Sequence, residues 1–107
     1  MVQPYHVEFS HEATNDLEAA IQWIKEDSIE AAEAFFYRLR NRCEIGLSST
    51  PHMGVVFTLA DETKLLALTC GTYRVFYMID EDSRVVTLIR ILHTSRDVQA
   101  ILGSQAL

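Results

Sequence analysis

The sequence has 107 residues, of which 49% are hydrophobic and 22% are charged. This composition excludes a disordered chain, and we expect residues 1–107 to form one globular domain. The formal net charge of −6 opposes a broad electrostatic grip on nucleic acid, which needs many cationic side chains. Only Lys25 and Lys64 are lysines, however. The other basic residues are arginines, which suit fixed bidentate contacts, so a local basic site stays open.

Nothing in the sequence predicts a membrane segment, a bound metal or a cofactor. Apolar runs such as Ile89–Leu92 are far shorter than the roughly 20 residues that span a bilayer. Met1–Phe9 lacks the basic start and apolar stretch of a secretory signal, so we expect a cytoplasmic protein. Cys43 and Cys70 lie among apolar residues without CxxC spacing, which predicts reduced core thiols. The histidines lack the spacing of metal ligands.

The N-terminal half is predicted to form a strand followed by a helical hairpin. Residues 5–9 alternate between apolar and polar side chains, the period of a half-buried strand. Ser10 is a good N-cap for an amphipathic helix over about residues 11–26. Ser28 should cap a second amphipathic helix that ends near Ser48. Because the turn between the two helices is very short, they must be antiparallel neighbours.

The C-terminal half is predicted to consist mainly of strands. Residues 55–59 are interpreted as a short strand or an ordered loop. Three segments rich in β-branched and aromatic residues follow, at residues 64–69, 73–80 and 84–93. Short turns separate these segments, which predicts a three-stranded antiparallel meander.

A short helix is predicted to end the fold. Ser95 should cap this helix, which would cover about residues 96–102 and end at Gly103. The predicted class is α+β with element order β-α-α-β-β-β-α, and the helical hairpin lies on one face of the sheet. Leu39 and Ile89 are both expected in the core, so an aspartate at either position should abolish folding.

Four separated segments carry a family resemblance: Val7–Leu17, Thr50–Gly54, Tyr73–Asp80 and Ile91–Asp97. Together they resemble the RelE/ParE superfamily of bacterial toxins over about residues 5–102. The resemblance implies a plasmid-stabilisation type of toxin, encoded in a two-component operon and neutralised by a cognate antitoxin protein. It also implies one of two targets, since RelE-type members cut messenger RNA on the ribosome and ParE-type members poison DNA gyrase.

The set of residues that RelE-type members use to cut RNA is incomplete in this sequence. Cutting RNA without a metal needs a base, positive charge and an acid. The resemblance carries two arginines over to Arg74 and Arg96. The two lysines of the preceding strand would fall at Leu65 and Ala67, and the C-terminal tyrosine near Leu102, where no charge or proton donor is available.

A binding protein is therefore favoured over an enzyme, and the preferred hypothesis is a ParE-like toxin that inhibits DNA gyrase. The alternative is a ribosome-dependent messenger RNA endoribonuclease with Arg74, Arg96 and His93 as a reduced catalytic set. A degenerate, non-toxic member that retains antitoxin binding is a further alternative, which the acidic charge supports. A homodimer is left open.

Cationic and aromatic side chains are the candidate contacts for the antitoxin or the target: Lys64, Arg74, Arg90, Arg96 and Trp23. Each of these also has a structural interpretation. Arg74 and Arg90 could pair with surface carboxylates, and Arg96 could serve local charge pairing at a helix start. His93 could be a structural histidine, and Trp23 could belong to the core.

Overall fold

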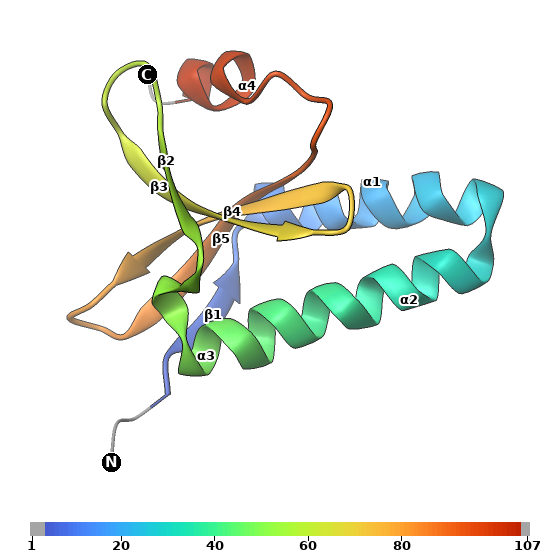
Figure 1. Cartoon of the computed structure of the whole chain (residues 1–107), viewed down its shortest axis with the longest axis horizontal. Helices are drawn as coiled ribbons and strands as arrows, with labels where there is room; N and C mark the ends of the chain where they lie inside the picture. The colour runs from blue at the N-terminus through green and yellow to red at the C-terminus, as the bar shows by residue number, and fades with distance from the viewer. Residues whose placement is uncertain (1–3, 106–107) are drawn as a thin grey trace.

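The computed structural model describes residues 4–105 and consists of a five-stranded sheet with helices on both faces (Figure 1). The elements follow in the order β1 (His6–Phe9), α1 (His11–Asp27), α2 (Ile29–Arg40), a π-helical segment (Asn41–Gly46), α3 (Leu47–Ser49), a 3-10 turn (Pro51–Met53), β2 (Val55–Thr58), β3 (Lys64–Cys70), β4 (Tyr73–Asp80), β5 (Val85–His93) and α4 (Val98–Gln105). The predicted α+β class is confirmed, and the element order differs from the predicted β-α-α-β-β-β-α by the additional strand β2.

The predicted helical hairpin is present, and local capping explains where its helices begin. The Ser10 hydroxyl accepts a hydrogen bond from the Ala13 N–H at 3.0 Å, and Ser28 does the same for Ala31 at 3.1 Å. Each cap satisfies an N–H that has no partner inside its own helix. The second helix departs from the prediction, because regular α-helix stops at Arg40 and a π-helical segment leads into α3.

The sheet is larger than the predicted meander because a strand is added at each edge. The strand order is β1-β5-β4-β3-β2, and β1 pairs with β5 in parallel while the other pairs are antiparallel. β2 resolves the ambiguity over residues 55–59 in favour of a strand. Between β4 and β5 the register shifts by one residue, since Phe76 pairs with Arg90 but Tyr77 pairs with Leu88.

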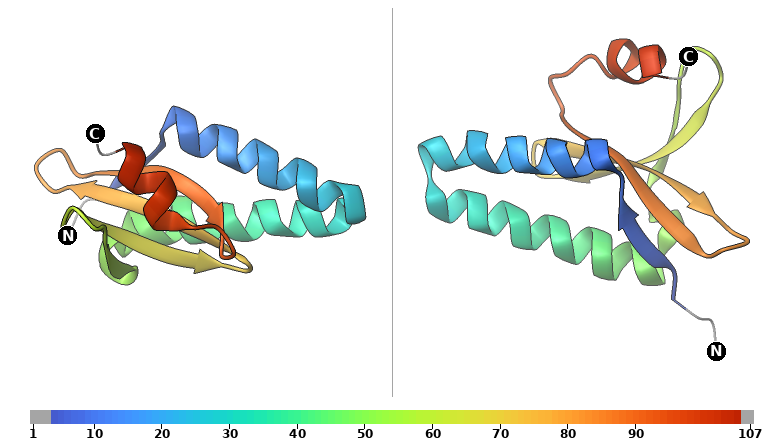
Figure 2. Two further views of the ribbon diagram at one scale, coloured as in Figure 1. Left: turned by 90° about the horizontal axis from the view of Figure 1, so that it is seen from above. Right: turned by 180° about the vertical axis from the view of Figure 1, so that it is seen from behind.

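Both faces of the sheet are covered, each by its own apolar cluster. The larger cluster lies under the hairpin and includes Leu39, Tyr77 and Leu88. The smaller one lies under α4 and contains Leu65, Phe76, Leu92 and Leu102 among others. Figure 2 shows α4 on the opposite side of the sheet from α1 and α2. The apolar run at the start of β3 supplies both clusters, because successive side chains of a strand point to opposite faces.

The start and the end of the last helix were predicted wrongly. Asp97, not Ser95, caps α4, because an Asp97 carboxylate oxygen accepts the Ala100 N–H at 3.2 Å. The Ser95 hydroxyl instead lies 2.8 Å from the His93 ring. Gly103 lies inside the helix, which continues to Gln105. Glycine inside a helix lowers its stability but does not end it. The backbone of Gly103 does not adopt the left-handed conformation that would end a helix.

The segment between the hairpin and β2 is held by a buried tyrosine. The Tyr77 hydroxyl donates to the Pro51 carbonyl at 2.8 Å and accepts the Gly54 N–H at 2.9 Å. A Cβ atom at Gly54 would lie only 2.5 Å from the Tyr77 hydroxyl oxygen and 2.9 Å from the Ala67 carbonyl oxygen. Glycine is therefore required at this position because the backbone passes so close to β3 and β4.

The two cysteines are buried free thiols, as predicted. Burial raises the pKa of the Cys43 thiol to about 12 and also raises that of Cys70. Both thiols therefore stay protonated and unreactive in the folded protein at neutral pH. Within residues 4–105, no helix is long and apolar enough to cross a membrane, and no group of three or more potential metal ligands is found.

Candidate functional site

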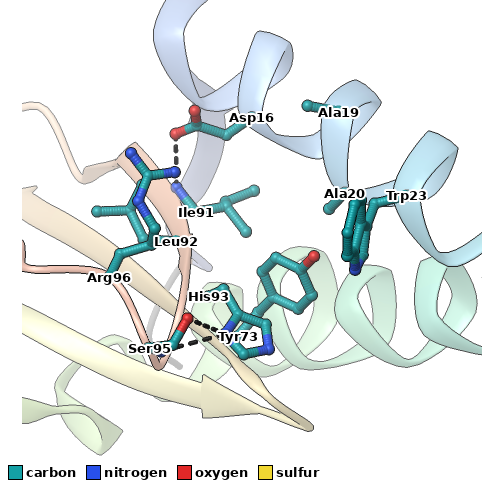
Figure 3. A pocket seen from close by; sticks show the side chains of 10 residues that line it. All are labelled: Asp16, Ala19, Ala20, Trp23, Tyr73, Ile91, Leu92, His93, Ser95 and Arg96. Carbon is teal, nitrogen blue, oxygen red and sulfur yellow. Dashed lines mark hydrogen bonds between the residues drawn. The ribbon is translucent and has the colours of Figure 1, made fainter.

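A cleft of about 470 Å³ lies between α1 and the end of β5 (Figure 3). One wall comes from the exposed side of α1, and the other from β5, the start of β4 and the loop that leads to α4. The lining residues are Asp16, Ala19, Ala20, Trp23, Tyr73, Ile91, Leu92, His93, Ser95 and Arg96. Small side chains on α1 keep the cleft open, since alanine fills little of the space between helix and strand.

Tyr73 is the most deeply buried polar side chain of the cleft. It is 8% exposed, and its ring packs against Phe35 and His93 with ring centroids 5.0 and 5.2 Å apart. Its hydroxyl has no hydrogen-bond partner among residues 4–105 and points into the cleft toward Trp23 (Figure 3). Burial raises the pKa of Tyr73, so the hydroxyl stays protonated and is available as a donor.

The hydroxyls of two buried tyrosines on β4 allow a matched test. We expect Tyr77→Phe to lower the free energy of unfolding by about 1–3 kcal/mol, because it leaves the Pro51 carbonyl and the Gly54 N–H without their partner. Tyr73→Phe should change stability by less than about 0.5 kcal/mol, since the Tyr73 hydroxyl makes no hydrogen bond in the free protein. Urea unfolding of both variants measures the difference. Equal losses of unfolding free energy in the two variants would contradict the hydrogen bonds assigned to Tyr77 and their absence at Tyr73.

His93 is held in one orientation by the loop that follows it. Its Nδ1 atom lies 3.1 Å from the Ser95 N–H and 2.8 Å from the Ser95 hydroxyl. A backbone N–H can only donate, so Nδ1 is the acceptor and the proton of the neutral ring is on Nε2. His93 therefore presents an N–H donor at the rim of the cleft. In this tautomer Nε2 cannot act as a general base.

Arg96 and Trp23 lie at opposite ends of the cleft in the view of Figure 3. Arg96 is exposed, and its guanidinium makes no ion pair or hydrogen bond with the described part of the chain. Trp23 is 68% exposed, which rules out the interpretation of this residue as a core side chain. Exposed tryptophan and arginine side chains that line one cleft are typical of a surface that binds a partner.

Arg90 has a structural partner beside this cleft. Its Nε and Nη2 atoms lie 2.6 and 3.0 Å from the two carboxylate oxygens of Asp16. The Ile91 N–H donates to the same carboxylate at 2.9 Å. This carboxylate takes the place of a neighbouring strand, because β1 ends at Phe9 and leaves the edge of β5 uncovered beyond that point. The hydrogen bonds that Arg90 donates to Asp16 raise the pKa of Arg90, which stays charged.

Arg74 and Lys64 lie away from the cleft. The Arg74 guanidinium lies 5.8 and 5.6 Å from the ring centroids of Phe57 and Phe76, in contact with the α4 side of the sheet. Lys64 is exposed at the start of β3, beside a smaller hollow of about 270 Å³ that also contains His52. Of the predicted site residues, the structure thus brings together Trp23, His93 and Arg96.

Sequence reasoning missed the roles of Tyr73 and Asp16. Tyr73 was considered only as part of a strand pattern, yet its position directly after the β3–β4 turn places it opposite His93, the last residue of β5. Asp16 was included only as part of the Val7–Leu17 segment of the family resemblance. Its spacing from Ser10, less than two turns into α1, was the available signal that it could reach the sheet edge.

The comparisons with known proteins agree with this architecture. The profile of the family described as ParE toxin of the type II toxin–antitoxin system parDE matches residues 7–98. The crystal structure of the RelBE2 toxin–antitoxin complex from Mycobacterium tuberculosis contains a chain with a TM-score of 0.61 and 22% identity, and the match covers 87% of this chain and 94% of that chain. This likeness shows the fold.

A second solved structure is the archaeal RelE–RelB complex from Pyrococcus horikoshii OT3, with a TM-score of 0.47, 15% identity, and coverage of 88% of this chain and 99% of that chain. No curated protein is significantly similar to the sequence. The family match covers most of the chain and confirms the resemblance drawn from the four motifs. The chain therefore belongs to the ParE toxin family of type II toxin–antitoxin systems, within the RelE/ParE superfamily.

Proposed function

We propose that this toxin is a ParE-like inhibitor that acts in the cytoplasm by binding DNA gyrase, and that a cognate antitoxin neutralises it. No catalytic residue is needed for this activity. The observation that carries the proposal is the apolar character of the sheet face under α4, where the resemblance to RelE-type nucleases would put their catalytic lysines and tyrosine.

The positions of the missing catalytic groups are filled by core residues. Leu65 is 6% exposed and Leu102 is 4% exposed, and Ala67 packs against the same cluster. Arg74 remains near this face, where its guanidinium lies over the rings of Phe57 and Phe76. Each acid or base contributes roughly 10²–10⁴-fold to such a reaction, so the loss of two or three groups removes most of the catalysis. This supports recognition rather than hydrolysis of RNA.

Exposed apolar side chains on the helical hairpin support a protein partner. Trp23, Ile29 and Tyr37 are 68%, 55% and 60% exposed, and a shallow groove of about 380 Å³ runs between α1 and α2 beside Ile29 and Tyr37. Exposed aromatic side chains are common anchors of protein interfaces. The solved structure that shares the fold is a toxin–antitoxin complex, which supports an antitoxin as one of the partners.

A supercoiling assay tests this proposal directly. We expect the purified protein to inhibit supercoiling by DNA gyrase. Stoichiometric antitoxin should restore supercoiling. An absence of inhibition at high micromolar protein would count against the proposal.

Two further outcomes would favour the alternatives. Translation-dependent cleavage of messenger RNA that is lost in Arg74→Ala would indicate the endoribonuclease. Expression of the chain without growth arrest, together with retained antitoxin binding, would indicate a degenerate member.

A further inference from the structure

Three side chains that can donate hydrogen bonds, Tyr73, His93 and Arg96, converge on the cleft between α1 and β5. The Tyr73 hydroxyl and the Arg96 guanidinium have no partner within residues 4–105, and His93 presents its Nε2–H. The one carboxylate of the cleft, on Asp16, is already occupied by Arg90 and the Ile91 N–H. The Tyr73 side chain is largely buried, and its hydroxyl opens into the cleft, where a ligand atom can accept its hydrogen bond.

We propose that this cleft receives a carboxylate from an acidic peptide segment, held by Arg96 and Tyr73, while an adjacent apolar side chain of the segment lies against Trp23. This inference rests on the proposed function, since it assigns a surface to a protein partner. An arginine and a hydroxyl donor together match the acceptor oxygens of a carboxylate. The exposed indole and the two alanines of α1 supply the apolar contact.

The charge of the molecule favours a peptide over a nucleic acid as the source of the anion. The formal net charge of −6 repels a polyanion, whose binding depends on many phosphate contacts. A single carboxylate in a short peptide depends instead on local donors. The cleft offers one unengaged guanidinium, and the only other cation beside it, Arg90, is paired with Asp16.

Trp23 provides a built-in probe, because it is the only tryptophan of the chain and lies at the cleft. We would titrate the full-length protein with an acetylated and amidated pentapeptide that alternates leucine and glutamate, and follow tryptophan fluorescence. The matched ligand replaces both glutamates with glutamine. A third ligand is a short oligothymidylate, which tests the nucleic-acid alternative.

We expect the acidic peptide to change the fluorescence with saturation and to bind at least about tenfold more tightly than the glutamine peptide, the effect of losing one charge-assisted hydrogen bond. Arg96→Gln should weaken binding of the acidic peptide about tenfold, and Tyr73→Phe several-fold. The matched control is Arg42→Gln, which removes the same charge from an exposed arginine in the π-helical segment after α2 and should leave binding unchanged.

Several results would overturn the inference. The first is the absence of a saturable fluorescence change up to about 1 mM peptide, a concentration that corresponds to a binding free energy of only about −4 kcal/mol. The second is equal affinity of the protein for the acidic peptide and the glutamine peptide. The others are an unchanged affinity of Arg96→Gln for the acidic peptide, and tighter binding of the oligonucleotide than of the acidic peptide. The gyrase assay uses no peptide, so its result is separate. If the protein inhibits gyrase but does not bind the acidic peptide, only the peptide site is refuted. If it binds the acidic peptide but does not inhibit gyrase, only the proposed target is refuted.

Discussion

Leu39→Asp is expected to yield a protein without cooperative structure. Leu39 is 1% exposed and lies in the cluster between the helical hairpin and the sheet. An aspartate at this position loses the apolar contacts of leucine and places an unpaired charge where no water reaches it. The loss should exceed about 4–5 kcal/mol, a large part of the 5–15 kcal/mol that stabilises a typical domain. Circular dichroism during thermal unfolding measures it.

Tyr37→Asp is the matched control for Leu39→Asp. Tyr37 lies on the same helix but is 60% exposed, so the same new charge is solvated there and Tm should change little. The expectation that Ile89→Asp abolishes folding has to be corrected to an intermediate effect, because Ile89 is only partly buried against the smaller cluster. A soluble Leu39→Asp variant with cooperative unfolding would contradict the packing of the hairpin on the sheet.

Asp16→Ala is expected to lower the free energy of unfolding by about 3–5 kcal/mol. The side chains of Asp16 and Arg90 are only 15% and 14% exposed. The substitution therefore leaves a largely buried guanidinium without its counter-charge and the Ile91 N–H without its acceptor. The effect should appear as a fall in Tm of more than about 10 °C.

A double variant separates the charge from the hydrogen bond. Asp16→Ala combined with Arg90→Met should recover part of the lost stability, because an apolar side chain needs no counter-charge, although the Ile91 N–H stays without its acceptor. Glu44→Ala is the surface control. It breaks the exposed pair of Arg40 and Glu44 and should cost less than about 0.5 kcal/mol. If Asp16→Ala were as mild as Glu44→Ala, the pair would not hold the sheet edge.

Much of the fold could be predicted from the sequence because its signals are local. Ser10 and Ser28 satisfy N–H groups three residues further on, so the helix starts could be predicted from neighbouring residues. The alternation in β3 and β4 likewise depends only on the chain near each residue. The N-cap of the last helix was predicted wrongly because serine and aspartate are both good caps. The Ser95 hydroxyl contacts His93 instead, and Asp97 caps the helix.

The candidate site could be predicted only in part. Trp23, His93 and Arg96 were named from residue type and from the family resemblance, but nothing in their spacing indicated that they share a cleft. Arg90 was weighed as a partner of a surface carboxylate. The structure identifies that carboxylate as Asp16, which is 74 residues away in the sequence and largely buried.

The sequence by itself determined the helices, most of the strands and the family. The tertiary structure decided which face each residue of β5 serves. Ile89 has no opposite residue on β4, so Leu88 and Ile91 both join the cluster under the hairpin, while Ile89 and Leu92 pack under α4. A one-residue shift reverses the facing of every side chain that follows. Such a shift depends on pairing between distant strands, which no local pattern records.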